Sequence, residues 1–201
     1  DRFDYVISNP PYFKLSPNEP RGGDAPNIYA RFMEVSATLL KPGGSMCFIV
    51  PRSFASGVYF RRFRGRMRSV ASLMRVHLFE SRRDAFKGDG VLQENVIVVY
   101  TKCEDHGPVT ISVSTGESDL ETRWAHSVER SRVFAAAERQ SILFLPTSKD
   151  DLDVMEVFES WTDTLESHGL QVSTGPVVPF RAEEHLVHGD EAGTVPLLWL
   201  Q

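Results

Sequence analysis

Cysteine is scarce in this sequence of 201 residues, and long apolar runs are missing. The two cysteines, Cys47 and Cys103, are too few for a disulfide framework and lack the spacing of a metal site, so we expect reduced thiols and no metal. No stretch of 18 apolar residues occurs, so no membrane-spanning helix is expected. Hydrophobic residues make up 41% and charged residues 24% of the chain, as is usual for globular proteins. These features predict a cytoplasmic protein.

The charge is distributed unevenly along the chain. Residues 1–103 contain 16 Lys and Arg against 9 Asp and Glu, whereas residues 104–201 contain 6 against 18. Much of the basic excess comes from the run RRFRGRMR at 61–68. A basic half favours a polyanion as partner, because cations neutralise phosphates. The same run also fits the solvated face of a helix, and that alternative stays open.

The apolar pattern predicts alternating strands and helices. Residues 3–8 and 45–51 have the continuous apolar character of buried strands. Residues 27–39 between them predict a helix that ends at Lys41-Pro42-Gly43-Gly44. The helix face expected to pack on the sheet consists of Ile28, Phe32, Val35 and Leu39. A strand, a helix and a strand in this order form a βαβ crossover, so we expect the two strands to be parallel neighbours or near-neighbours.

Further strands and one particularly clear helix are predicted downstream. Residues 72–80 and 94–102 should form an antiparallel pair that closes the sheet. Residues 109–115 are expected to form a strand outside this core. The helix is predicted at 148–168, with Ser148 as its N-cap. Its apolar face, which we expect to pack against a neighbouring domain, consists of Val154, Phe158, Trp161 and Leu165.

The first strand is followed by Asn9-Pro10-Pro11-Tyr12. Neither proline can donate to a sheet ladder, so the pair ends the strand and fixes the next turn. Ligands of open α/β sheets bind outside the carboxyl ends of the strands. The Asn9 side-chain oxygen and the Pro10 carbonyl would present two acceptors there, with the ring of Tyr12 beside them. This set suits an amine on an aromatic ring, because both N–H groups find acceptors and the ring is stacked.

Such a site also has a chemical meaning. The amine of adenine is a poor nucleophile because its lone pair is delocalised into the ring. Hydrogen bonds from its two protons to Asn9 and Pro10 would favour a tetrahedral nitrogen whose lone pair faces an electrophilic methyl group. As an isolated tetrapeptide, NPPY is equally typical of a plain turn. Its place after a buried strand and before a helix ending in KPGG favours a functional motif.

The segment SNPPYF resembles motif IV, (N/D)PPY, of S-adenosylmethionine-dependent amino-methyltransferases. With LLKPGGSMCFIVPRSF, AFKGDGVLQENVIVVY and GLQVSTGPVVPFR, it makes the chain similar to adenine-specific (N6) DNA methyltransferases of restriction–modification systems, with a γ-like motif order. The resemblance implies an α/β fold, namely the C-terminal part of a Rossmann-like methyltransferase sheet. The implied domains are the catalytic part at 1–103, a mixed α/β connector at 104–168 and the start of a target-recognition domain at 169–201.

The resemblance also implies roles for individual residues. Asn9 and Pro10, in the turn completed by Pro11, would hold the amine of an adenine in double-stranded DNA, and Tyr12 would stack on that base after it leaves the duplex. Phe86 would be a second aromatic residue against the base. Asn9 and Phe13 are expected to lie near S-adenosylmethionine. Arg61, Arg62 and Arg64 are expected to contact DNA phosphates. A cognate restriction endonuclease activity is a further expected partner.

The FxGxG cofactor motif of this family is missing from the sequence. Gly43-Gly44 does not replace it, because these glycines end a helix instead of opening one. We therefore expect a C-terminal piece of a larger methyltransferase that is inactive by itself. Two alternatives stay open: the same chemistry on an RNA base or a protein glutamine amide, and a non-catalytic nucleic-acid-binding module. The long segment after residue 104 and the STGPVVPFR segment favour DNA.

Overall fold

The computed structural model divides the chain into two compact units, residues 1–156 and 157–201. The predicted boundary between residues 103 and 104 falls inside the first unit. Within the described part of the chain, no helix has both the length and the apolar character needed to cross a membrane. The residues that the structure describes are 2–14, 27–79, 94–104, 107–116, 124–134, 142–171, 183–187, 189 and 192–194.

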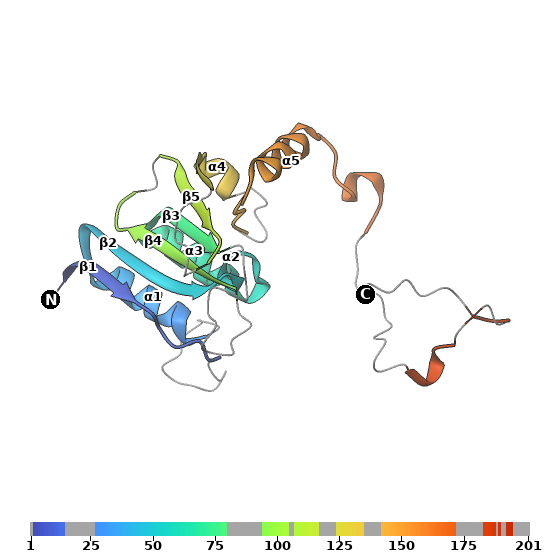
Figure 1. The fold of residues 1–201 in the computed structure, drawn as a ribbon, viewed down its shortest axis with the longest axis horizontal. Helices are drawn as coiled ribbons and strands as arrows, with labels where there is room; N and C mark the ends of the chain where they lie inside the picture. The colour runs from blue at the N-terminus through green and yellow to red at the C-terminus, as the bar shows by residue number, and fades with distance from the viewer. Residues whose placement is uncertain are drawn as a thin grey trace. The chain divides into compact units, whose positions relative to one another are not determined.

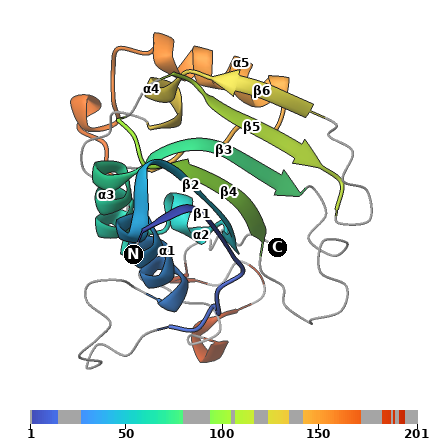
Figure 2. The same ribbon diagram turned by 90° about the vertical axis from the view of Figure 1, so that its left-hand side faces the viewer.

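The first unit is built on a six-stranded sheet with the order β1-β2-β4-β3-β5-β6 (Figure 1). The strands are β1 (Phe3–Ser8), β2 (Leu40–Pro51), β3 (Ser72–Phe79), β4 (Asn95–Thr101), β5 (Val109–Ser114) and β6 (Trp124–Val128). The parallel pairing of β1 with β2 and the antiparallel pairing of β3 with β4 are confirmed. Figure 2 shows the strands side by side, with β1 at one edge and β6 at the other.

The strand at 109–115 was expected outside the core, and this prediction is wrong. β5 pairs in parallel with β3 and antiparallel with β6, so it continues the same sheet. Val109, Ile111 and Val113 alternate along it and are almost completely buried. The pairing partner β3 is separated from β5 in the sequence by β4, which is why the local pattern did not predict the pairing.

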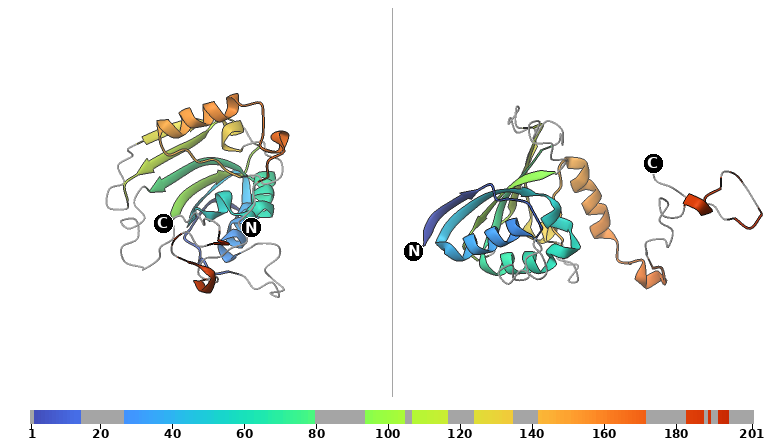
Figure 3. Two further views of the ribbon diagram at one scale, coloured as in Figure 1. Left: turned by 90° about the vertical axis from the view of Figure 1, so that its right-hand side faces the viewer. Right: turned by 90° about the horizontal axis from the view of Figure 1, so that it is seen from below.

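Helices cover one face of the sheet near its β1 side. They are α1 (Ile28–Leu39), α2 (Ser53–Ser56), the short 3-10 helix η1 (Val58–Phe60) and α3 (Arg61–Val70), and Figure 3 shows α1, α2 and α3 on the same side of the sheet. Their side chains form one apolar core with the facing side chains of the strands. Its largest fully buried members include Tyr29, Met33, Phe48, Phe54 and Phe63. Burial of such side chains stabilises the fold by about 1.5–3 kcal/mol each.

The inward face of α1 differs from the predicted one. Phe32, Val35 and Leu39 are 43%, 40% and 39% exposed. The side chains that are buried instead are Tyr29, Ala30, Met33, Glu34 and Ala37. Alanines let the helix approach the sheet closely, and the apolar pattern could not indicate a buried carboxylate. Glu34 is held there by Arg31, at 3.6 Å, and by Arg66 of α3, at 3.5 Å.

The helix predicted at 148–168 is shorter than expected. It forms α5 (Lys149–Ser160), followed by the short 3-10 helix η2 (Glu166–His168), which ends at Gly169 with φ +70°. The capping prediction is confirmed, because the Asp151 N–H donates to Ser148 Oγ at 3.2 Å. Hydrogen bonds from Thr147 lower the pKa of the Asp151 carboxyl. The side chains of the predicted apolar face are more than half exposed: Val154, Phe158, Trp161 and Leu165. The remaining short helices are α4 (Arg130–Val133) and the 3-10 helix η4 (Glu183–His185).

β1 is an edge strand that carries exposed apolar side chains. Tyr5 is 78% and Ile7 is 84% exposed, although both belong to a strand that pairs with β2 along most of its length. An edge strand of this kind is a template for further strand pairing. The outer edge of β1 is therefore a place where a further strand can pair and extend the sheet.

Two glycines make possible the irregular first part of β2, where its register with β1 shifts. Gly43 has φ +78°, a conformation that favours glycine. At Gly44, a Cβ atom would lie 3.0 Å from each of three backbone carbonyl oxygens, those of Phe3, Asp4 and Lys41. Backbone atoms cannot move away as a flexible side chain can. The close approach of β1 to β2 therefore depends on the missing side chain at position 44.

We predict that Gly44→Ala lowers the free energy of unfolding by about 1–3 kcal/mol, because the added methyl group overpacks against the backbone. Gly65 in α3 is the matched control, since a Cβ atom there has nothing within 4 Å. Gly65→Ala should raise the free energy of unfolding by up to about 1 kcal/mol through helix propensity. Urea unfolding followed by circular dichroism measures both. A neutral Gly44→Ala would contradict the tight approach of the two strands.

Candidate active site

The segment Asn9-Pro10-Pro11-Tyr12 lies where the sequence predicts it, directly after the end of β1. β1, β2, β3 and β5 all run in the same direction, so their carboxyl ends share one edge of the sheet. Pro10 is buried, whereas the Asn9 side chain is exposed at this edge. The turn is thus anchored in the protein through a proline and presents the asparagine amide outward.

The hydroxyl of Tyr12 fixes the asparagine. It donates to Asn9 Oδ1 at 2.6 Å, and it also lies 3.1 Å from the carbonyl oxygen of Ile49 in β2. Burial raises the pKa of the Tyr12 hydroxyl, so it remains protonated at neutral pH. An amide oxygen has two lone pairs and can accept a second hydrogen bond while Tyr12 occupies the first. Asn9 Oδ1 is therefore held in place and still able to accept a donor from a ligand.

The residues after the motif are tied to the start of α1. The carbonyl of Phe13 accepts a hydrogen bond from the Ile28 N–H at 3.1 Å, and Lys14 forms an antiparallel bridge with Asn27. The side chain of Phe13 is 57% exposed. Phe13 and Asn9 thus offer an exposed aromatic ring and an exposed amide in the segment that follows β1. These groups fit one wall of a site for a cofactor with a heteroaromatic ring and polar ends.

Phe86, the predicted second aromatic residue, lies outside the described residues. The described residues at both ends of its segment lie at the carboxyl edge of the sheet. β3 ends there with Phe79, and Glu94 stands beside Arg52, just after β2. The Arg52 N–H donates to the Glu94 carbonyl at 2.6 Å, and their side chains form an ion pair at 3.3 Å. Sequence reasoning missed this pair, because the two residues are far apart in the chain and belong to no motif.

Three of the arginines at 61–68 serve the fold. Arg64 is only 5% exposed, and its guanidinium donates at 2.8 Å to each of two carbonyl oxygens, those of Phe54 and Gly57. Arg64 is therefore removed from the set expected to contact phosphate, because its cation is buried and committed to the backbone. Arg66 pairs with Glu34, and Arg68 lies over the ring of Phe134 at 5.0 Å.

Arg61 and Arg62, the other two arginines predicted at phosphates, are exposed on α3. Both stand in the first turn of the helix, which begins at Arg61. They remain candidates for phosphate contacts.

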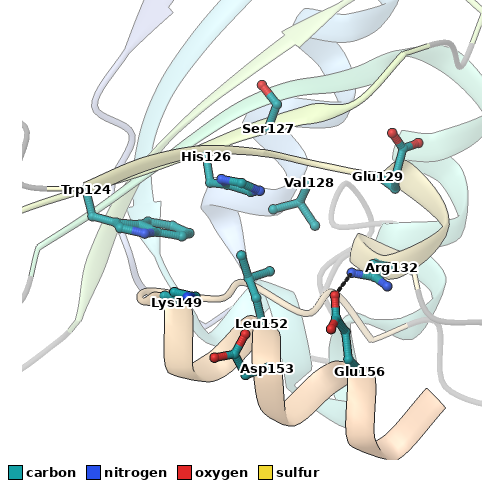
Figure 4. A pocket seen from close by; sticks show the side chains of 10 residues that line it. All are labelled: Trp124, His126, Ser127, Val128, Glu129, Arg132, Lys149, Leu152, Asp153 and Glu156. Carbon is teal, nitrogen blue, oxygen red and sulfur yellow. Dashed lines mark hydrogen bonds and ion pairs between the residues drawn. The ribbon is translucent and has the colours of Figure 1, made fainter. Parts of the chain in front are cut away.

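A cavity of about 440 Å³ lies between β6 and α5, at the opposite edge of the sheet from β1 (Figure 4). Trp124 and His126 point from the strand toward the helix, with nearly parallel rings whose centroids are 5.9 Å apart. Arg132 and Glu156 form an ion pair at 3.4 Å across the cavity. The cavity contains none of the residues predicted for catalysis, and its lining residues come from a part of the sequence without motifs.

Comparison with known families supports the predicted resemblance. Residues 1–86 match the Eco57I restriction-modification methylase family. The chain is 36% identical over 205 residues to the type II methyltransferase M.BsuBI of Bacillus subtilis, covering 98% of this chain and 40% of the relative. It is 33% identical to the type II methyltransferase M.PstI of Providencia stuartii, covering all of this chain and 41% of the relative. The predicted resemblance to restriction–modification methyltransferases is thereby confirmed.

The chain spans about two fifths of the length of these curated relatives. Among solved structures, a modification subunit assigned to a type I restriction enzyme of Vibrio vulnificus YJ016 superposes with a TM-score of 0.53 at 12% identity. The superposition covers 79% of this chain and 40% of that chain. This likeness concerns the fold alone. Together with the mixed sheet, it confirms the predicted Rossmann-like α/β class.

The buried guanidinium gives a testable prediction. Arg64→Ala should lower the free energy of unfolding by about 2–4 kcal/mol, because two carbonyl oxygens would be without their charged donor and a buried side chain is removed. Arg61→Ala, an exposed change on the same helix, should stay within about 0.5 kcal/mol. Chemical denaturation of both variants checks this. Equal effects of the two substitutions would show that Arg64 is not the internal clamp described above.

Proposed function

We propose that this chain, whose residues 1–86 match the restriction–modification methylase family, is the catalytic portion of a cytoplasmic DNA methyltransferase. The reaction is the transfer of a methyl group from S-adenosylmethionine to the N6 amine of an adenine that has been flipped out of double-stranded DNA. The observation that carries the proposal is the rigid turn at the carboxyl edge of β1. There Asn9 Oδ1 is fixed by the Tyr12 hydroxyl at 2.6 Å and remains open to a second donor.

The Asn9-Pro10 turn acts on the amine by position. The two amine N–H groups donate hydrogen bonds, one to Asn9 Oδ1 and the other to the Pro10 carbonyl. The nitrogen lone pair is then free to face the methyl group. The amine nitrogen would then take the methyl group, with the cofactor's sulfur as leaving group keeping the C–S electron pair, and one amine proton would leave to solvent. Neither acceptor is a strong base, so the rate enhancement comes from orientation and from dipoles aimed at the growing positive charge on nitrogen.

Tyr12 supplies the surface on which the base stacks. Its ring is half-buried and its hydroxyl is held, so the ring is in place before a base arrives. Burial raises the pKa of the hydroxyl further above neutrality, which keeps the ring uncharged. A flipped purine requires an aromatic face, because it gives up stacking in the duplex. Phe86 is proposed as the second aromatic residue against the same base.

S-adenosylmethionine, when bound, supplies an electrophilic methyl group on a positively charged sulfur. Asn9 and Phe13 would hold it from the side of this chain, since both side chains are exposed in the segment that follows β1. The exposed side chains of Tyr5 and Ile7 on β1 support a further part of the proposal, which concerns the rest of the enzyme. A strand of the cofactor-binding part of the enzyme pairs with β1 and places the cofactor next to Asn9.

The remaining parts of the chain are assigned by position. Residues 104–168 are proposed as the connector and residues 169–201 as the start of the target-recognition domain. Arg61 and Arg62, exposed in the first turn of α3, are proposed to contact DNA phosphates. A cognate restriction endonuclease activity that recognises the same site is the proposed functional partner.

The first test is the removal of the side-chain acceptor. Asn9→Ala in the full natural polypeptide should lower the rate of methyl transfer from radiolabelled S-adenosylmethionine to duplex DNA by about 10²–10³-fold, the effect of removing one preorganised electrostatic interaction. Binding of duplex DNA should change little, because the phosphates carry most of that affinity.

Ser8→Ala is the matched control, since Ser8 is the last residue of β1 and precedes the asparagine directly. Its transfer rate should stay within about twofold of wild type, as a change of stability alone would leave the chemistry intact. An Asn9→Ala variant that methylates DNA at the wild-type rate would overturn the assigned role. DNA binding without any transfer by the wild type would favour the non-catalytic module instead.

The phosphate contacts are tested by salt dependence. Replacing Arg61 and Arg62 by Ala should weaken binding of all duplex sequences similarly. The slope of log K against log salt should become shallower by about 0.9 for every phosphate that is no longer neutralised. Fluorescence anisotropy with a labelled duplex at several salt concentrations measures this slope. An unchanged slope would mean that the first turn of α3 faces solvent in the complex.

A further inference from the structure

A second tyrosine lies against the motif without belonging to it. Tyr29 stands in the first turn of α1, and its ring centroid is 6.2 Å from that of Tyr12, with the ring planes at 86°. Tyr29 is only 1% exposed, so it is buried behind Tyr12 and is not part of the open edge. The two rings form an edge-to-face pair, which is a favourable arrangement for aromatic side chains.

Tyr12 needs such a neighbour for a geometric reason. Its hydroxyl is held by Asn9 Oδ1 at 2.6 Å and by the Ile49 carbonyl at 3.1 Å. These contacts fix the far end of the side chain but leave the ring able to turn about its long axis, because that torsion has a broad energy profile. A ring placed perpendicular to it blocks this rotation. Tyr29 is thus placed where it can limit rotation of the Tyr12 ring.

Tyr29 is itself rigidly held. Its ring is stacked on Phe60, with centroids 5.5 Å apart and planes at 21°, and its hydroxyl lies 3.3 Å from Ser53 Oγ. Burial raises the pKa of Tyr29 to about 12, so the hydroxyl remains a neutral hydrogen-bonding group at any working pH. These contacts fix the Tyr29 ring both at its face and at its hydroxyl.

Ser53 and Phe60 flank the turn that Arg64 clamps. Within this turn, the Gly57 N–H donates to the Ser53 carbonyl at 2.8 Å and the Phe60 N–H donates to the Gly57 carbonyl at 3.0 Å. The Arg64 guanidinium fixes the turn from inside through the carbonyls of Phe54 and Gly57. A continuous set of contacts therefore leads from α3 to the Tyr12 ring.

We propose that Tyr29 is a positioning residue for the methyl-transfer site, which sets the plane of the Tyr12 ring on which the flipped base stacks. The inference rests on the proposed function. In an edge-to-face pair, Tyr29 contacts at most one face of Tyr12, so Tyr29 itself does not cover the opposite face. The ring is the part of Tyr29 that acts on Tyr12, and its hydroxyl only anchors it to Ser53.

The test uses the full natural polypeptide and three variants. Tyr29→Leu removes the perpendicular ring, and Tyr29→Phe keeps the ring without its hydroxyl. Tyr59→Leu is the matched control, because Tyr59 is 86% exposed. Single-turnover methyl transfer to duplex DNA gives the rate. The fluorescence of 2-aminopurine, placed at the adenine that the wild type methylates, reports the stacking of the flipped base.

Tyr29→Leu should slow single-turnover transfer by about 3–10-fold, the size of one aromatic pair interaction. It should also raise the fluorescence of bound 2-aminopurine, since a Tyr12 ring that rotates stacks less on the base, while the affinity for duplex DNA stays unchanged. Tyr29→Phe and Tyr59→Leu should match wild type within about twofold, because each keeps the ring at position 29. A merely structural role for Tyr29 would lower stability without changing the fluorescence of the bound base.

If Tyr29→Leu does not fold, Tyr29→Met takes its place, because the unbranched, flexible methionine side chain adapts to an irregular gap without presenting a ring. Wild-type rate and wild-type fluorescence in the folded variant would overturn the positioning role while leaving the proposed function intact. A wild-type protein that transfers no methyl group to DNA would instead overturn the proposed function, and the inference with it.

Discussion

The parallel pairing of β1 with β2 is the constraint on which the site depends. Ser8 pairs with Phe48, so the turn after β1 arrives beside the carboxyl end of β2. Only there can the Tyr12 hydroxyl reach the Ile49 carbonyl, at 3.1 Å, while it holds Asn9. The pairing in turn requires the close approach at Gly44, where three backbone oxygens leave no room for a side chain. The lack of a side chain at Gly44, near the start of β2, is thus needed for the contact between Tyr12 and Ile49 near the end of the same strand.

Rigidity is the property that the surrounding elements contribute. An acceptor pair accelerates amine chemistry only if its oxygens are in place before the substrate binds, because any reordering would consume part of the binding energy. In this chain, a series of contacts holds the residues of the site in place. The guanidinium of Arg64 fixes the turn at 54–57, the turn fixes the side chains against Tyr29, and Tyr29 meets Tyr12 edge to face. The side chains at the open edge are thus supported by buried polar and aromatic contacts that belong to the fold.

The sequence allowed the position of the motif and the first crossover to be predicted, because both depend on local signals. Two prolines after a buried strand end it at a known point, and a helix between two apolar strands predicts parallel pairing. The inward face of α1 was not predictable in the same way, since Glu34 is buried through arginines that the apolar pattern ignores. Arg64 lies in a run that is typical of a solvated surface, and only packing shows its carbonyl partners. The pairing of β5 within the sheet and the contact of Tyr29 with Tyr12 were missed because both join residues that are distant in the sequence.

The measurement that tests the central claim most directly is nucleoside mass spectrometry of duplex DNA after incubation with the full natural polypeptide and S-adenosylmethionine. RNA and a glutamine-containing protein substrate are incubated in parallel. If the Asn9-Pro10 acceptors hold the amine of a flipped adenine, N6-methyladenine appears in the DNA and the parallel samples stay unmethylated. Methylation of the RNA or the protein alone, or of cytosine in place of adenine, would contradict the assignment of the base and of the substrate.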